Sequence, residues 1–235
     1  MYVIIMKFVV SEKVFEKYPD TKIGAIVATN IENKGVGEEI LKLLEDVQSS
    51  TKEKFEINTL IENSSIAVWR NVYNSFGSKP RDYRSSVEAL IRSVLNGRGV
   101  RHINKLVDIY NYISLKHVIP VGGEDIDKIE GNLHLKFSEG NESFIPLGSD
   151  KEDNPYKGEV IYCDDNKNTL CRRWNWRESD KTKMTESTKN AIIVIEGFNS
   201  NVELALKELS DLIKKFCNAR TEVFLIEETN SIAEW

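Results

Sequence analysis

The sequence predicts an α+β fold in which mixed sheets pack against helices. In the first half of the chain, apolar strand-like runs alternate with segments of helical periodicity, but no strict strand–helix–strand repeat appears. After Gly131 the pattern changes to short alternating pieces separated by Gly, Asn, Asp and Pro, which is typical of β-strands and turns. The 235 residues are 40% hydrophobic and 29% charged, which suffices to bury a core as one large or two small domains.

The elements of the first half are predicted from the spacing of apolar residues. Residues 2–10 and 23–31 are apolar and β-branched, so both are predicted strands. Apolar residues such as Ile40 and Leu44 recur three to four positions apart, as on one face of a helix. This spacing predicts one helix that begins at Gly37 and three further helices over residues 59–75, 86–96 and 102–116.

The second half is predicted to contain most of the strands. Short alternating runs predict strands at LHLKF (133–137), SFIPL (143–147), EVIYC (159–163) and TLCRRW (169–174). A buried strand over 190–197, a helix over 201–216 and a strand over 221–228 follow. We expect a single domain over 1–235, with an α/β elaboration at 1–78, a core at 79–200 and a C-terminal helix and strand at 201–235.

Composition excludes several classes of protein. The net charge of −5 gives no whole-molecule basic field, so a general nucleic-acid coat is not expected. No apolar run approaches the roughly 18 residues of a membrane span, and the start MYVIIMKFVV resembles a strand more than a signal peptide. Three cysteines without a Cys-x-x-Cys pair indicate a reduced, cytoplasmic protein.

Common catalytic and cofactor motifs are missing. Gly35-Val36-Gly37 has Ile40 where a dinucleotide fingerprint needs its third glycine. The chain has no Gly-Lys-Ser/Thr phosphate loop and no Gly-x-Ser-x-Gly elbow. Its three histidines do not pair at metal-ligand spacing, so neither a metal nor a cofactor is predicted.

Two segments carry residue types suited to binding a polar ligand. In VGGED (121–125), Gly122 and Gly123 permit close approach of backbone N–H groups to a ligand, although a simple turn explains them equally well. Glu196 ends an otherwise apolar strand, where a carboxylate is costly unless it is paired, functional or directed to solvent.

A third segment, LCRRWNWR (170–177), interleaves two tryptophans with three arginines, as single-stranded RNA recognition requires. In a regular strand, Arg173 would face one side while Arg172, Trp174 and Trp176 face the other. The alternative is a strand whose aromatic residues pack on one face. Further arginines, including Arg84 and Arg98, fall in loops and either converge on phosphates or are unrelated solvated side chains.

Three ordered blocks of residues resemble a known domain. The blocks are Asn104, Val107, Asp108, Asn111, Tyr112 and Ile113; then Pro120, Asp125, Asp127 and Gly131; then 184–190 and 192–196. Together they resemble the editing (B3/B4) domain of the phenylalanyl-tRNA synthetase β subunit over about residues 80–200. The other modules of that subunit have no counterpart here, so the chain resembles the small freestanding B3/B4 proteins.

The resemblance implies a B3/B4-like fold, an aminoacylated tRNA as partner, and hydrolysis in trans of the ester of a mischarged tRNA. The residues expected to take part in catalysis are Glu196, Gly122, Gly123 and Asn111. Those expected to bind substrate are Tyr110, Glu124, Asp125, Arg172, Arg173, Trp174, Trp176 and Arg84. No aminoacylation activity is expected.

Two positions depart from the family pattern. The loop histidine of the family falls on Gly122, and the helix threonine falls on Tyr110. Both are recognition groups for a misacylated tyrosine, so the resemblance implies a smaller or differently shaped ligand here. The alternatives are a non-catalytic module that binds RNA or an amino acid, and an interaction domain without a small-molecule site.

Overall fold

The computed structural model describes residues 5–198 and 201–235. The helices are α1 (Glu12–Lys17), α2 (Glu38–Lys54), α3 (Ser64–Ser75), α4 (Ser86–Leu95), α5 (Lys105–His117) and α6 (Val202–Cys217), with short 3₁₀ helices η1 (Leu60–Glu62) and η2 (Ile126–Lys128). The strands are β1 (Lys7–Val10), β2 (Thr21–Thr29), β3 (Val121–Asp125), β4 (Leu133–Phe137), β5 (Val160–Asp164), β6 (Thr169–Arg172), β7 (Arg177–Glu178), β8 (Ala191–Phe198), β9 (Arg220–Ile226) and β10 (Ile232–Glu234). The α+β class predicted from the sequence is confirmed.

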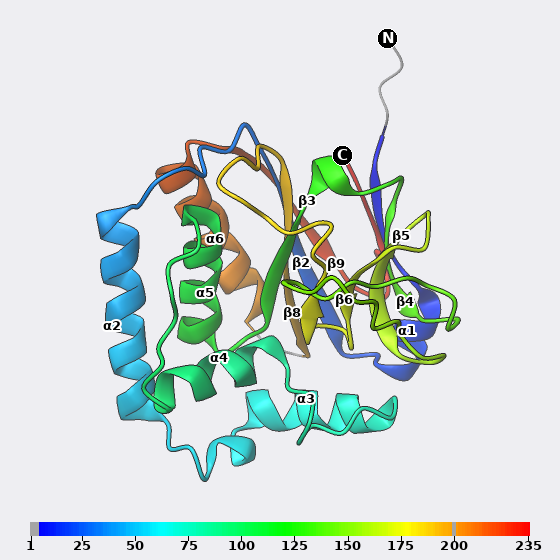
Figure 1. The fold of residues 1–235 in the computed structure, drawn as a ribbon, viewed down its shortest axis with the longest axis horizontal. Helices are drawn as coiled ribbons and strands as arrows, with labels where there is room; N and C mark the ends of the chain where they lie inside the picture. Colours follow the sequence, from blue (N-terminus) through cyan, green and yellow to red (C-terminus); the bar gives the residue numbers. More distant parts are fainter. Residues whose placement is uncertain (1–4, 199–200) are drawn as a thin grey trace.

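The strands form two sheets. The four-stranded sheet has the order β3-β8-β2-β9 and all its pairs are antiparallel, while the six-stranded sheet has the order β10-β1-β4-β5-β6-β7. In Figure 1 the four-stranded sheet stands between the helices α2, α5 and α6 and the six-stranded sheet, and α3 and α4 lie across one end of these layers. The strand β2, from the segment expected to be an elaboration, is a central strand of its sheet.

The four-stranded sheet is covered on both faces, which explains its nearly continuous apolar strands. On β8, Ile193 and Ile195 pack with α5 and α6, whereas Ile192 and Val194 pack with residues of the six-stranded sheet. A side chain at Gly24 of β2 would lie 2.8 Å from the Leu206 side chain, so this glycine permits the close packing of α6 on the sheet.

Most predicted elements are present, with shifted ends. The helix predicted over 59–75 is divided into η1 and α3, because the Asn63 side chain accepts a hydrogen bond from the Ser65 N–H at 3.0 Å and starts a new helix. The helix predicted over 102–116 begins later, at Lys105, after the Asn104 side chain accepts from the Val107 N–H at 3.0 Å.

Three expectations about local structure were incomplete or wrong. Residues 121–125 are an edge strand rather than a loop, and 143–147 contribute only isolated bridges. The strand predicted over 169–174 ends at Arg172, because Arg173 and Trp174 adopt φ values of 49° and 66° that turn the chain into β7. The part of the first predicted strand over residues 2–4 lies outside the described residues.

Arg172 anchors a long loop to the end of β6. Its Nε and Nη2 donate to the two carboxylate oxygens of Glu159, both at 2.8 Å, and its Nη1 lies 2.7 Å from Oδ1 of Asp153. The side chains of Arg172 and Glu159 are 2% and 0% exposed. This buried, two-pronged ion pair therefore fixes the chain before β5 against the turn that follows β6.

We expect Arg172→Ala to lower the free energy of unfolding by roughly 3–5 kcal/mol, because it leaves the buried Glu159 carboxylate without its cationic partner. The control Arg81→Ala removes an exposed arginine and should change this free energy by no more than about 0.5 kcal/mol. Urea denaturation of both variants measures the difference, and equal effects would contradict the structural role assigned to Arg172.

Candidate functional site between the two sheets

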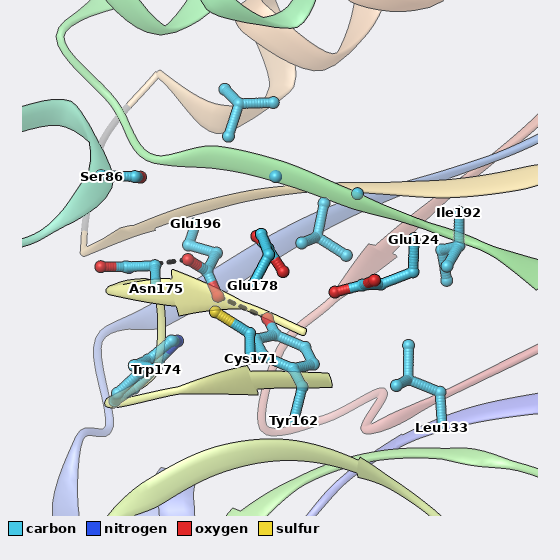
Figure 2. Close-up of a pocket in the computed structure, with 14 residues that line it drawn as sticks. Ser86, Glu124, Leu133, Tyr162, Cys171, Trp174, Asn175, Glu178, Ile192 and Glu196 are labelled. Carbon is cyan, nitrogen blue, oxygen red and sulfur yellow. Dashed lines mark hydrogen bonds between the residues drawn. The ribbon is translucent and has the colours of Figure 1, made fainter. Parts of the chain in front are cut away.

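A narrow cavity lies where the β3–β8 edge of one sheet faces β5, β6 and β7 of the other. We call it the inner cavity, and its lining residues are Ser86, Val121, Gly122, Gly123, Glu124, Leu133, Tyr162, Cys171, Trp174, Asn175, Glu178, Ile192, Val194 and Glu196. Figure 2 shows Glu124, Glu178 and Glu196 directed into the space between the sheets. Its volume of about 20 Å³ accommodates on the order of one water molecule.

Strand alternation brings the residues of the four-stranded sheet to this cavity. Gly122 is paired with Val194 and Glu124 with Ile192, so both β3 residues share the face of β8 that packs toward the other sheet. Glu196 lies two residues beyond Val194 on the same face. A carboxylate at the end of an apolar strand is therefore directed between the sheets rather than to solvent, and it is 2% exposed.

The opposite wall is a row of residues across three strands. Tyr162 of β5 is paired with Cys171 of β6, and Cys171 is paired with Glu178 of β7. Asn175, in the turn between β6 and β7, completes the wall. The Tyr73 hydroxyl donates to Oδ1 of Asn175 at 2.9 Å, which directs the amide nitrogen of Asn175 toward Glu196.

Glu196 is held by two hydrogen bonds. The Tyr162 hydroxyl donates to Oε1, and Nδ2 of Asn175 donates to Oε2 at 2.7 Å (Figure 2). Burial raises the pKa of Glu196 to about 8, although both donors oppose the rise by favouring the carboxylate. A carboxyl group with a pKa near neutrality can both accept and release a proton under physiological conditions.

Glu124 and Glu178 form a pair of carboxyl groups in the inner cavity. Burial raises the pKa of Glu124 well above its ordinary value, and the negative charge of Glu178 raises it further. Burial also raises the pKa of Glu178. Oε2 of each is buried and has no hydrogen-bond partner among the described residues. Two such groups side by side cannot both ionise cheaply, so they favour a shared proton or a bound cation.

A wider space of about 310 Å³, which we call the outer chamber, adjoins the inner cavity. The two share Ser86, Val121, Asn175 and Glu178. Tyr110 and Asn111 of α5 line the outer chamber, and burial, followed by the charge of Glu178, raises the pKa of the Tyr110 hydroxyl. Tyr110 therefore remains a neutral hydroxyl beside the carboxyl groups.

Several residues predicted from the sequence meet at these spaces. Those that line the inner cavity are Gly122, Gly123, Glu124, Trp174 and Glu196, and those that line the outer chamber are Tyr110, Asn111 and Trp176. Trp174 contributes one wall of the cavity, but it is fully buried and packs edge-on against Tyr18 and Trp69, so no base can stack on it. Arg84 lines a separate groove together with Trp176.

Three predicted binding residues lie away from the inner cavity. Arg172 is buried in its ion pair with Glu159. Arg173 is 4% exposed, with its guanidinium carbon 3.6 Å from the ring centre of Tyr83, so it packs on aromatic rings. Asp125 accepts from the Thr188 hydroxyl at 2.7 Å and caps η2, so it joins two segments. These contacts correct the expectation that all three bind substrate, because each charged group is directed into the protein.

The two glycines of β3 have different roles. The Asp125 N–H donates to Thr182 O at 2.9 Å, on the side of β3 away from β8. Because alternate N–H groups of a strand point to opposite sides, the Gly123 N–H faces this open edge and the Gly122 N–H faces β8. Both N–H groups were expected to be available to a ligand. The Gly123 N–H is directed away from β8, whereas the Gly122 N–H is directed into the pairing with β8.

Sequence reasoning missed Tyr162, Cys171, Asn175 and Glu178. Asn175 belongs to the tryptophan–arginine run and Glu178 directly follows it, but the strand predicted there ends at residue 174, so neither was identified. Tyr162 and Cys171 are aligned by the pairing of β5, β6 and β7, and nothing in the sequence predicts this pairing. Among the described residues, no group of three His, Cys, Asp or Glu side chains is placed to hold a metal ion.

An α+β domain with a carboxyl-lined cavity between two sheets is thus the class that the fold and site define. The model of the family described as B3/4 domain matches residues 68–218, which is more than half of the sequence. The chain therefore belongs to the B3/4 domain family, which confirms the resemblance seen in the sequence. No helix in the described part of the chain is both long and apolar enough to span a membrane.

Curated relatives are similar over about half of the chain. The phenylalanine–tRNA ligase β subunit of Fusobacterium nucleatum is 28% identical over 121 residues, covering 51% of this chain and 15% of that subunit. The corresponding subunit of Ruegeria pomeroyi is 32% identical over 129 residues, covering 50% of this chain and 16% of the subunit. The chain thus spans about a sixth of the length of either relative.

A solved structure is also similar. An N-terminal fragment of the phenylalanyl-tRNA synthetase β subunit from Pyrococcus horikoshii matches 91% of this chain and 49% of its own, with a TM-score of 0.48 and 16% sequence identity.

We expect Gly123→Ala to destabilise the protein more than Gly122→Ala. A Cβ at Gly123 would lie 2.9 Å from the Ile192 carbonyl oxygen, which belongs to the paired backbone of β8 and cannot move away. The expected loss is about 2 kcal/mol of unfolding free energy. A Cβ at Gly122 meets only Oε1 of Glu178 at 2.8 Å, and this side chain can rotate. Denaturant unfolding compares the two, and a larger loss for Gly122→Ala would contradict this geometry.

Glu196 should also make stability depend on pH. Because burial raises its folded-state pKa from the ordinary 4.5 to about 8, the folded state binds this proton more tightly than the unfolded chain does. The stabilisation is complete below about pH 4.5 and is lost as the pH rises toward 8. Between roughly pH 5.5 and 7.5, the wild type should lose about 2 kcal/mol more than Glu196→Gln. Urea denaturation at each pH measures the free energy of unfolding. If it falls equally with pH in both proteins, burial does not keep Glu196 protonated.

Proposed function

We propose that this chain binds aminoacylated tRNA and hydrolyses in trans the ester that joins a mischarged amino acid to the tRNA. The observation that carries the proposal is the cluster of Glu124, Glu178 and Glu196 in one buried cavity of a B3/4 domain. The relatives named above are phenylalanine–tRNA ligase β subunits, which supports tRNA as the macromolecular partner. Such a role belongs to the cytoplasm.

The carboxyl pair suits the α-amino group of the ligand. A free ammonium group supplies three hydrogen-bond donors and one positive charge. Glu124 and Glu178 each offer an unpaired buried oxygen, and binding a cation there relieves their mutual repulsion. Glu178 lines both the inner cavity and the outer chamber, so an ammonium group entering from the wider space meets this carboxyl group first.

Glu196 suits the role of general base. With the Tyr162 and Asn175 hydrogen bonds orienting its carboxylate, Glu196 takes a proton from a water molecule as the water oxygen attacks the ester carbonyl carbon. The carbonyl oxygen gains negative charge, which the Gly123 N–H on the open edge of β3 stabilises. The bond to the ribose oxygen then breaks, and this oxygen takes the proton back from Glu196.

A second candidate function is binding without turnover. The observation that favours it is the size of the inner cavity, because about 20 Å³ holds a water molecule but no amino-acid side chain. The outer chamber, lined by Tyr110 rather than a threonine, then holds the amino acid or nucleotide. This module would retain the pocket but keep the ester out of reach of Glu196.

Deacylation assays with a panel of mischarged tRNAs test the proposal. For the tRNA that the protein deacylates, Glu196→Gln should lower kcat/KM by about a hundredfold or more, since a positioned base contributes on that order. The wild-type rate, after subtraction of the rate without protein, should rise with pH and level off above about pH 8.

Glu222→Gln, which alters an exposed carboxylate on β9, serves as the control and should retain wild-type activity. Binding of tRNA with no turnover across the panel would instead establish the second candidate. Wild-type activity in Glu196→Gln, with folding verified by circular dichroism, would refute the assignment of the base.

A further inference from the structure

A deep groove beside the outer chamber is lined by four arginines. Arg84 lies in the loop before α4, Arg92 near the end of α4, Arg98 in the loop after it, and Arg177 in β7. The other lining residues are Ile57, Asp82, Ala89, Asn96 and Trp176. We call this space, of about 480 Å³, the arginine groove. In a protein of net charge −5, such a concentration of positive charge is local and requires an explanation.

The arginine groove adjoins the outer chamber of the candidate site. It shares Ala89 and Trp176 with the outer chamber, which in turn shares Glu178 and Asn175 with the inner cavity. The helix α4 follows the whole path, with Ser86 at the inner cavity and Asn96, just after the helix, in the groove.

Two arginines of the groove, Arg84 and Arg92, lie beside the carboxylate of Glu88. This carboxylate is fully buried and accepts from Nη1 of Arg70 at 2.9 Å and from Nε of Arg92 at 2.8 Å, while Nε of Arg84 lies 3.8 Å away. Glu88 thus positions several guanidinium groups without neutralising them all. Arg98 and Arg177 are exposed and take part in no ion pair among the described residues. The arginines outnumber Asp82 and Glu88, so the groove retains positive charge.

Trp176 lies between the basic groove and the acidic cavity. Its indole lines both the arginine groove and the outer chamber, so part of its surface is open. The remainder is supported by Tyr83, whose ring stands edge-on at 5.0 Å, and by Arg173, whose guanidinium carbon lies 4.3 Å from the indole centre. An aromatic ring that is fixed in place and partly exposed is a stacking surface for a nucleic-acid base.

We propose that the arginine groove binds the phosphates of a single-stranded RNA 3′ end, with its last base against Trp176. The charges along the path match such a ligand, since guanidinium groups pair with phosphates at one end and carboxyl groups accept an ammonium group at the other. The inference rests on the proposed function for the direction of the strand. Binding of RNA in the groove does not require that the ester be hydrolysed.

The test measures binding of a short single-stranded RNA that carries no amino acid, by fluorescence anisotropy at several salt concentrations. Arg98→Gln/Arg177→Gln removes two exposed side chains, so folding should be unaffected. The double variant should bind at least about fivefold more weakly near physiological salt, and the slope of log affinity against log salt should fall by about 1.4. Trp176→Ala should weaken binding without changing this slope, because stacking releases no counterions.

The matched control Lys207→Gln/Lys214→Gln removes the same charge from exposed positions on α6 and should bind RNA as the wild type does. Equal losses in both double variants, or unchanged binding after loss of Arg98 and Arg177, would overturn the proposal. So would binding of an acidic peptide in preference to the RNA. The RNA probe carries no amino acid, so its binding does not depend on deacylation. If the protein binds this RNA but deacylates no tRNA, the groove assignment stands while the proposed function fails.

Discussion

The packing of β8 between β2 and β3 determines most of what this protein can do. Because both faces of β8 are covered, strict alternation divides its side chains between the helical layer and the other sheet. Glu196 falls on the inter-sheet face, and β3 adds Glu124 to the same face. A shift of β8 by one residue in this register would move Glu196 to the helix side, where α5 and α6 pack, and the cavity would lose this carboxyl group.

Electrostatics divides the site into two contrasting parts. The inner cavity holds three carboxyl groups whose pKa values are raised chiefly by burial, whereas the arginine groove retains positive charge above the buried Glu88. The helix α4 and Trp176 connect the two. The low net charge of the whole chain conceals this arrangement, because opposite charges are separated along one path rather than mixed over the surface.

The candidate site was partly predictable from the sequence. Glu196 and Gly122 were identified because a carboxylate in an apolar strand and paired glycines are unusual locally, and the structure brings them into one cavity. The tryptophan–arginine run was placed less well, since Arg173 and Trp174 adopt a left-handed turn instead of continuing a strand. That turn buries Trp174 and directs Arg173 onto Tyr83, while Trp176 and Arg177 remain accessible.

The sequence alone determined the α+β class, most helices and strands, and the likeness to B3/4 domains, because periodicity and ordered motifs are local properties. Only the tertiary structure decided that Tyr162, Cys171 and Glu178 form a wall opposite Glu124, and that arginines from α4, the loops on either side of it and β7 meet in one groove. These groups are far apart along the chain. Strand register and helix packing bring them together, and both depend on contacts that no single segment contains.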